Sequence, residues 1–148
     1  HLGNSKYMTI VHNKEDGGTP EIDLDEELKN GHFVLELINK QLVESSHDVG
    51  EGGILIAVAE MCIAGNLGIT IDEDKEFSHR FYFGEDQSRY LLEIRPENFD
   101  QLKQLSESKN VFFEKLGVVD QAIIKINNLN EIKVSELRNN FERGVGNI

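Results

Sequence analysis

The feature that most constrains the fold is an apolar segment from Ile54 to Ala64, interrupted only by Glu60. The segment is shorter than the roughly 20 residues that a membrane-spanning helix needs. Because its apolar side chains would occupy nearly every side of a helix, a helix over 54–65 is expected to be covered all round. A chain of 148 residues is long enough to cover it, so we predict a single domain over residues 1–148.

A second helix is predicted from Leu24 to Leu42, because apolar residues recur there at spacings of three and four. This apolar stripe consists of Leu24, Leu28, Gly31, Leu35, Ile38 and Leu42. Asp23 and Glu26 match a capping box at the start of the helix. The stripe is expected to be the buried face.

The remaining segments predict a mixture of strands and helices. Alternation of Phe77, Phe81 and Phe83 with polar residues predicts a half-buried strand over 77–83. Further strands are predicted over 7–11, 67–71, 90–94, 111–119 and 122–126. Pro96 is expected to open a helix, and Ser135 is expected to cap a last helix through Phe141. Because the two kinds of element do not alternate regularly, the predicted fold class is α+β.

Charge and cysteine content exclude several classes of protein. The chain has 15 Lys and Arg against 27 Asp and Glu, a net charge of −12, which argues against a nucleic-acid surface. The lone Cys62 excludes an internal disulfide and a multi-cysteine zinc site. The acidic loop Asp72–Glu76 lacks the glycine and glutamate of a calcium loop. With no secretory signal and with His1 in place of Met, we expect a soluble intracellular piece of a longer protein.

The glycine-rich turn 47–53 is the first candidate site. Gly50, Gly52 and Gly53 directly precede the predicted apolar helix, where backbone N–H groups and the helix dipole favour an anion. The alternative is a tight turn in which glycine only supplies a positive φ. His47 and Asp48 are neighbours on an extended segment, so their side chains are expected to face opposite ways and not to form a proton relay.

The segment Phe83–Tyr90 is the second candidate site. Glu85, Asp86, Gln87 and Arg89 could together hydrogen-bond a polar substrate. The alternative is a solvated turn between two strands.

The two segments together resemble a known family. Ser46–Gly53, followed by Ala57–Met61, is similar to the signature of the carboxy-terminal domain of the aminoimidazole ribonucleotide synthetase superfamily. Phe83–Tyr90 resembles a segment of one branch, phosphoribosylformylglycinamidine synthase, in the second of its two copies of this domain. Gly50 and Asp86 depart from that pattern, because each stands where the family has serine. The start and end of the chain, Leu2–Met8, Val134–Leu137 and Phe141–Glu142, also resemble this branch.

The resemblance implies a fold, an activity and a site. The fold is an α+β sandwich with a mixed sheet, packed helices and partial ferredoxin-like topology. The branch converts formylglycinamide ribonucleotide, ATP and glutamine-derived ammonia to the amidine, and uses Mg²⁺. Its catalytic histidine and metal ligands sit in another type of domain, so this chain is expected to be a non-catalytic scaffold. By resemblance, one wall of an auxiliary nucleotide site would comprise His47, Asp48, Gly50, Gly52, Gly53, Glu85, Asp86 and Gln87.

The same resemblance implies partners and a location. The expected partners are other domains of the same polypeptide, with a glutaminase and a small accessory subunit if the enzyme is the small form. No nucleic acid and no membrane are expected, and the expected location is the cytoplasm. Two alternatives remain open: an independent module that binds a small phosphorylated ligand, and another ATP-dependent enzyme of the superfamily, such as aminoimidazole ribonucleotide synthetase.

Overall fold

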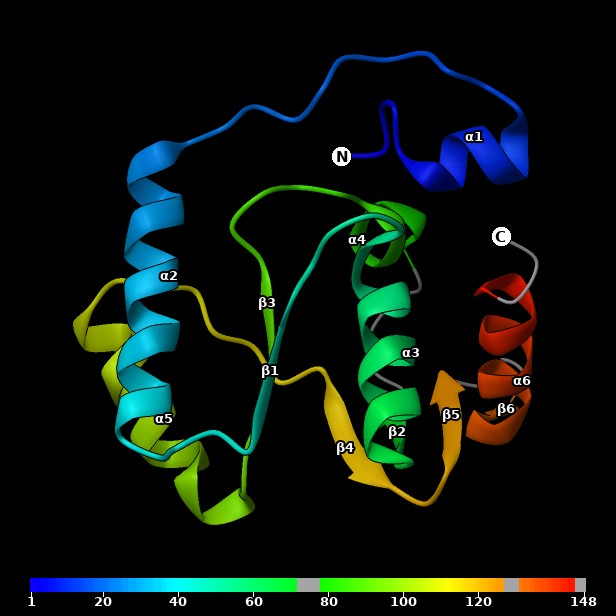
Figure 1. Cartoon of the computed structure of the whole chain (residues 1–148). Helices are drawn as coiled ribbons and strands as arrows, with labels where there is room; N and C mark the ends of the chain where they lie inside the picture. Colours follow the sequence, from blue (N-terminus) through cyan, green and yellow to red (C-terminus); the bar gives the residue numbers. More distant parts are fainter. Residues whose placement is uncertain (72–77, 127–130, 146–148) are drawn as a thin grey trace. The chain divides into compact units, whose positions relative to one another are not determined.

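The computed structural model describes residues 1–71, 78–126 and 131–145 (Figure 1). It divides into two compact units, one of residues 1–57 and 79–114 and the other of residues 58–78 and 115–148. In chain order the elements are α1 Lys6–His12, α2 Leu24–Asn39, β1 Ser45–Asp48, α3 Gly53–Gly65, β2 Gly68–Ile71, α4 His79–Phe83, β3 Tyr90–Glu93, the 3₁₀ turn η1 Pro96–Asn98, α5 Phe99–Ser108, β4 Gly117–Asp120, β5 Ile123–Ile126, β6 Glu131–Lys133 and α6 Val134–Val145. The predicted acidic loop 72–76 lies outside the described residues, and the single domain over 1–148 stays a prediction.

The first unit is built on an antiparallel pair of strands, β1 and β3, in which Ser45 lies opposite Glu93. Helices α2 and α5 pack with this pair (Figure 1). The core that joins them consists of Phe33, Leu37, Leu42 and Leu102. Pro96 opens a 3₁₀ turn that continues into α5, as the sequence predicts. Burial of these large side chains is the main contribution to the stability of this unit.

The predicted helix over 24–42 is confirmed as α2 over 24–39. Its predicted buried face is wrong within α2, although Leu42, just beyond the helix, is buried as predicted. Asp23 caps α2 by accepting hydrogen bonds from the N–H groups of Asp25 and Glu26, both at 3.0 Å. The residues of α2 that are buried are Phe33 and Leu37, which lie off the leucine stripe. The stripe side chains Leu24, Leu28, Leu35 and Ile38 are 45–74% exposed.

Two segments predicted as strands are helices where the structure describes them: residues 7–11 lie in α1 and residues 79–83 form α4, while Phe77 lies outside the described residues. In α1, Ser5 is almost fully buried and its hydroxyl accepts from the N–H of Met8, which caps the helix. In α4, His79–Phe83, the ring of Phe83 stacks on Tyr7 with centroids 4.6 Å apart. Both runs are too short for periodicity to distinguish a strand from a helix. Here the cap and the aromatic contacts favour the helix.

The second unit has a four-stranded sheet in the order β4-β2-β5-β6. The β2–β5 pair is parallel and the other two pairs are antiparallel, so the mixed sheet and the α+β class are confirmed. Ile71, Ile124 and Val134 are buried in this unit. Arg138 of α6 donates a hydrogen bond to the carbonyl of Ile63 in α3.

Several boundaries in this unit differ from the predictions. Of the strand predicted over 111–119, only residues 117–119 belong to an observed strand, β4. Strand β6 was not predicted. Ser135 lies inside α6 rather than capping it, since the helix follows β6 directly at Val134. The helix over 54–65 is confirmed as α3, but it is not covered all round, because Ile56 is 44% exposed. Across the described residues, no helix combines the length and apolar character needed to cross a membrane.

Candidate ligand-binding site

One carboxylate joins the two sequence motifs within the first unit. Oε1 of Glu85 accepts a hydrogen bond from the N–H of Gly52 at 2.8 Å and another from the N–H of Lys6 at 2.7 Å. Gly52 immediately precedes α3, and Lys6 is the first residue of α1. Backbone N–H groups at helix starts have no partner within the helix. The side chain of Glu85 therefore supplies the hydrogen-bond acceptor that both helix starts lack.

The geometry of the turn shows why two of its glycines are needed. Gly52 and Gly53 have φ values of +83° and +74°, which other residues rarely adopt. A Cβ on Gly53 would lie 2.7 Å from the carbonyl oxygen of Tyr82 and 2.8 Å from that of Gly84, which is too close. A Cβ on Gly50, in contrast, would meet nothing within 4 Å. Gly52 and Gly53 serve the turn and its packing, whereas Gly50 is free to vary.

The predicted anion site at this turn already contains an anion of the protein itself. The amino end of a helix favours a negative charge, and the Glu85 carboxylate lies there. Lys6 places a cation beside the turn, with Nζ 3.6 Å from Oε2 of Glu51. The turn interpretation therefore has direct structural support, while ligand binding at the turn stays a prediction.

The residues after Glu85 have separate partners. Oδ2 of Asp86 lies 3.9 Å from NH1 of Arg89. The Arg89 guanidinium donates to the carbonyls of Gly84 at 3.1 Å and Phe81 at 2.9 Å, which satisfies the end of α4. Burial lowers the pKa of Arg89 from its ordinary value, and the charge of Asp86 opposes that change. Gln87 is exposed.

His47 and Asp48 lie on β1, before the turn. Nδ1 of His47 lies 2.6 Å from the backbone oxygen of Asp48, and the Asp48 side chain is 81% exposed. The histidine ring therefore contacts the backbone, and the two side chains do not form a short carboxylate–imidazole hydrogen bond, since Nδ1 is 3.8 Å from Oδ1. Of the eight predicted site residues, the structure links Glu85 directly to the glycine turn through Gly52.

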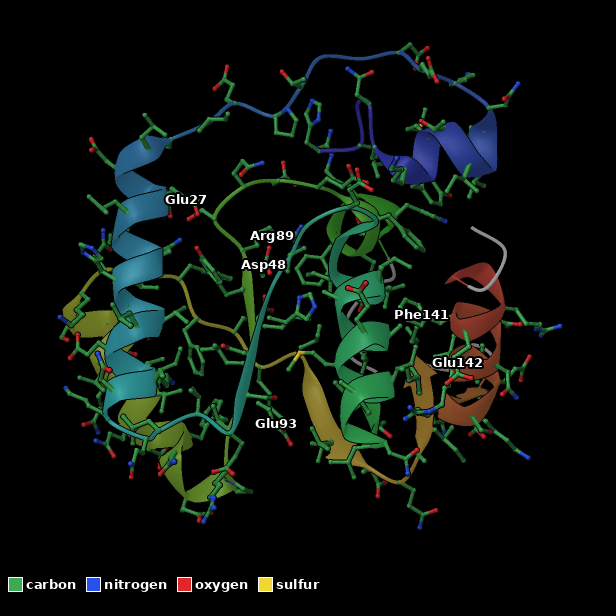
Figure 2. The ribbon with its side chains drawn as sticks, in the orientation of Figure 1. Glu27, Asp48, Arg89, Glu93, Phe141 and Glu142 are labelled. Atoms are coloured by element: carbon green, nitrogen blue, oxygen red, sulfur yellow. The ribbon has the colours of Figure 1, made fainter. Side chains whose placement is uncertain are left out.

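A polar cluster between α2 and the start of β3 was not predicted. The Tyr90 hydroxyl donates to Oε1 of Glu27 at 3.0 Å, and Nδ2 of Asn30 donates to the hydroxyl of Ser88 at 2.8 Å. Figure 2 shows Glu27 projecting from α2 towards this segment. Burial and the Glu27 carboxylate raise the pKa of Tyr90. The spacing of Glu27 and Asn30, three residues apart on one helix face, was the available signal.

The described side chains do not gather into a metal-binding cluster. Within residues 1–71, 78–126 and 131–145, no three His, Cys, Asp or Glu side chains are grouped so that they could hold a metal ion. The described side chains therefore form no metal cage made by the protein alone.

The α+β fold, the glycine turn before α3 and the Glu85 segment define a class of domain. Residues 1–124 match the family described as "AIR synthase related protein, C-terminal domain". The chain belongs to this family, as the sequence resemblance indicates.

The relatives specify the branch of the family. The chain is 36% identical over 143 residues to phosphoribosylformylglycinamidine synthase subunit PurL of Bartonella quintana, which covers 96% of this chain and 19% of the relative. The chain thus spans about a fifth of the length of such relatives. Among solved structures, Thermotoga maritima PurL complexed with FGAR has a TM-score of 0.67 at 22% identity, covering 76% of this chain and 21% of that one. T. maritima PurL complexed with ATP has a TM-score of 0.66 at 21% identity, with 74% and 21% covered. These two structures support the fold.

Proposed function

We propose that this chain acts as one domain of a phosphoribosylformylglycinamidine synthase, within a longer polypeptide. The observation that carries the proposal is the match to PurL, which extends over 96% of the chain. The complete protein would convert formylglycinamide ribonucleotide, ATP and glutamine-derived ammonia to the amidine, ADP, phosphate and glutamate. ATP and Mg²⁺ would be its cofactors, and it would work in the cytoplasm with a glutaminase partner or domain.

Within that protein, the chain would be a scaffold and would not perform the chemistry alone. The described residues offer no metal-ligand group, and their site carboxylate is engaged with backbone N–H groups. In the test, the 148-residue chain receives formylglycinamide ribonucleotide, ATP, Mg²⁺ and an ammonium salt, and ADP is measured. We expect no ADP above a protein-free control. Turnover comparable with that of an intact synthase would contradict the scaffold role.

The second part of the proposal is that the turn and the Glu85–Gln87 segment form one wall of an auxiliary nucleotide site. The Glu85–Gly52 hydrogen bond supports it, because it holds the two motifs together as one surface. No Lys or Arg lies within the glycine turn itself, and the nearby Lys6 and Arg89 are paired with Glu51 and Asp86. Neighbouring domains would therefore supply the positive charge that a phosphate needs.

Gly50 allows this wall to be tested without disturbing the fold. Gly50→Asp adds a negative charge where a Cβ meets nothing within 4 Å, so it should lower the nucleotide content of the purified full-length protein and leave its melting temperature unchanged. Gly18→Asp is the matched control, since its Cβ is equally unobstructed. Unchanged nucleotide content in a folded Gly50→Asp protein would refute the wall. Gly52→Val is less informative, because its side chain would collide with Ile56.

A further inference from the structure

Helix α2 carries an apolar stripe that the described chain does not cover. Leu24, Leu28, Leu35 and Ile38 are 74%, 58%, 54% and 45% exposed. Their spacings of four, seven and three place them along one face of the helix. With a rise of 1.5 Å per residue, the stripe extends over about 21 Å. Single exposed leucines are ordinary, but a continuous stripe on one helix is typical of an interaction surface.

This stripe is not the face that packs in the first unit. The core of that unit receives Phe33 and Leu37 from α2, and both are almost fully buried. Thus α2 has two apolar faces, one inside the unit and one outside it. A helix that is apolar on two sides is typical of an element with partners on both.

The occupant of the outer face can be argued from length and charge. The chain spans 19% of the length of its PurL relative, so in such a protein most of the polypeptide lies outside this chain. A second copy of the chain is a poor occupant, because its net charge is also −12. In addition, acidic Asp25, Glu26 and Glu27 form the first turn of α2, so the stripe begins beside negative charge.

We propose that the stripe Leu24, Leu28, Leu35 and Ile38 docks against another domain of the same longer polypeptide. The partner surface is apolar and carries Lys or Arg near Asp25, which lies three residues from Leu28 at the start of α2. This inference rests on the proposed function only in requiring that the chain works within a longer protein. The new element is the face of α2 through which this chain contacts its neighbour.

Cysteine labelling of the full-length protein tests this docking. Leu28→Cys and Leu35→Cys are made singly, and Glu26→Cys is the control, because its exposed side chain lies on another side of the same helix. Each protein is treated with a maleimide, and mass spectrometry of the α2 peptide gives the labelling rate at that position alone. Each rate is divided by the rate of the same variant in denaturant.

We expect positions 28 and 35 to label an order of magnitude or more slowly than position 26, because a docked side chain reacts only when the interface opens. Equal normalised rates would overturn the docking. Protection that appears only as protein concentration rises would also overturn it, since the occupant would then be a second copy. Leu24→Cys repeats the measurement should either variant fail to fold. Labelling requires no substrate, so the docking is tested separately from the proposed function. A protein that is an active synthase but reacts freely at positions 28 and 35 would refute the docking and leave the proposed function intact.

Discussion

At the scale of single residues, the carboxylate of Glu85 holds together parts of the chain that are far apart in sequence. It accepts from Lys6, 79 residues away, and from Gly52, 33 residues away. Hydrogen bonds to an ionised acceptor are stronger than neutral ones. These two hydrogen bonds give the carboxylate at position 85 a structural role that needs no ligand.

Replacement of Glu85 by alanine should destabilise the 148-residue chain. The change leaves two backbone N–H groups without their acceptor, which costs about 1.5–3 kcal/mol when the bonds are to a charged group. Glu85→Gln should lose less, because its amide oxygen can still accept. Urea unfolding gives these differences, with Gln87→Ala as the control on an exposed neighbour. An Ala variant as stable as the control would show that the two bonds contribute nothing.

Glu36 makes a pH-dependent contribution to stability. Hydrogen bonds from Lys109 and Lys40 lower its pKa from 4.5 to about 2, and the ion pairs are 2.8 Å and 2.7 Å long. Because the folded pKa lies below the unfolded one, the contribution is present above about pH 4.5 and is lost as pH falls towards 2.

The measurement is the difference in unfolding free energy between the chain and its Glu36→Gln variant as a function of pH. We expect a difference that is constant near neutral pH and shrinks in acid. Glu107→Gln, at an exposed position of α5, is the comparison. A Glu36→Gln difference that stays constant down to about pH 2 would contradict the lowered pKa of Glu36.

At the scale of elements, long helices and the glycine turn could be predicted from sequence, but short apolar runs could not. The capping residue Asp23 and the periodicity after it located α2 correctly. Runs 7–11 and 77–83 carry too few residues to separate a period of 2 from one of 3.6. The helical state of residues 7–11 in α1 and of residues 79–83 in α4 depends on contacts such as Tyr7 with Phe83, which periodicity does not report.

The buried face of α2 and the role of Glu85 show a second limit. The leucine spacing located one apolar face of α2, but the helix has two. Tertiary packing buries the other face, which carries Phe33 and Leu37. Similarly, the sequence singled out both the turn and Glu85. It could not show that they bond to each other, because that requires two segments 33 residues apart to meet.

Two leucines on α2 should differ sharply in their effect on stability. Leu37 is fully buried, so Leu37→Ala should leave a cavity and cost about 2–5 kcal/mol in the isolated 148-residue chain. Leu35→Ala, at a 54% exposed site on the same helix, should change stability by no more than about 0.5 kcal/mol. Chemical denaturation of both variants checks this. The opposite order would restore the leucine stripe as the buried face.

At the scale of the whole molecule, the proposed function gives this chain a structural role and places the chemistry elsewhere in the polypeptide. The described residues supply an α+β framework with a mixed sheet, a glycine turn bonded to Glu85 and an exposed apolar stripe on α2. The catalytic groups and metal ligands of the proposed synthase would come from the remainder of the polypeptide. In the proposed role this chain would position its neighbours, so its effects should be measured in the complete protein.

The most direct measurement is nitrogen transfer by the full-length protein that contains this chain. The protein is supplied with formylglycinamide ribonucleotide, ATP, Mg²⁺ and an ammonium salt labelled with nitrogen-15, and the nucleotide product is analysed by mass spectrometry. We expect an amidine product that carries the label, formed together with ADP and only when ATP is present. A folded full-length protein that leaves formylglycinamide ribonucleotide unlabelled and consumes no ATP would contradict it.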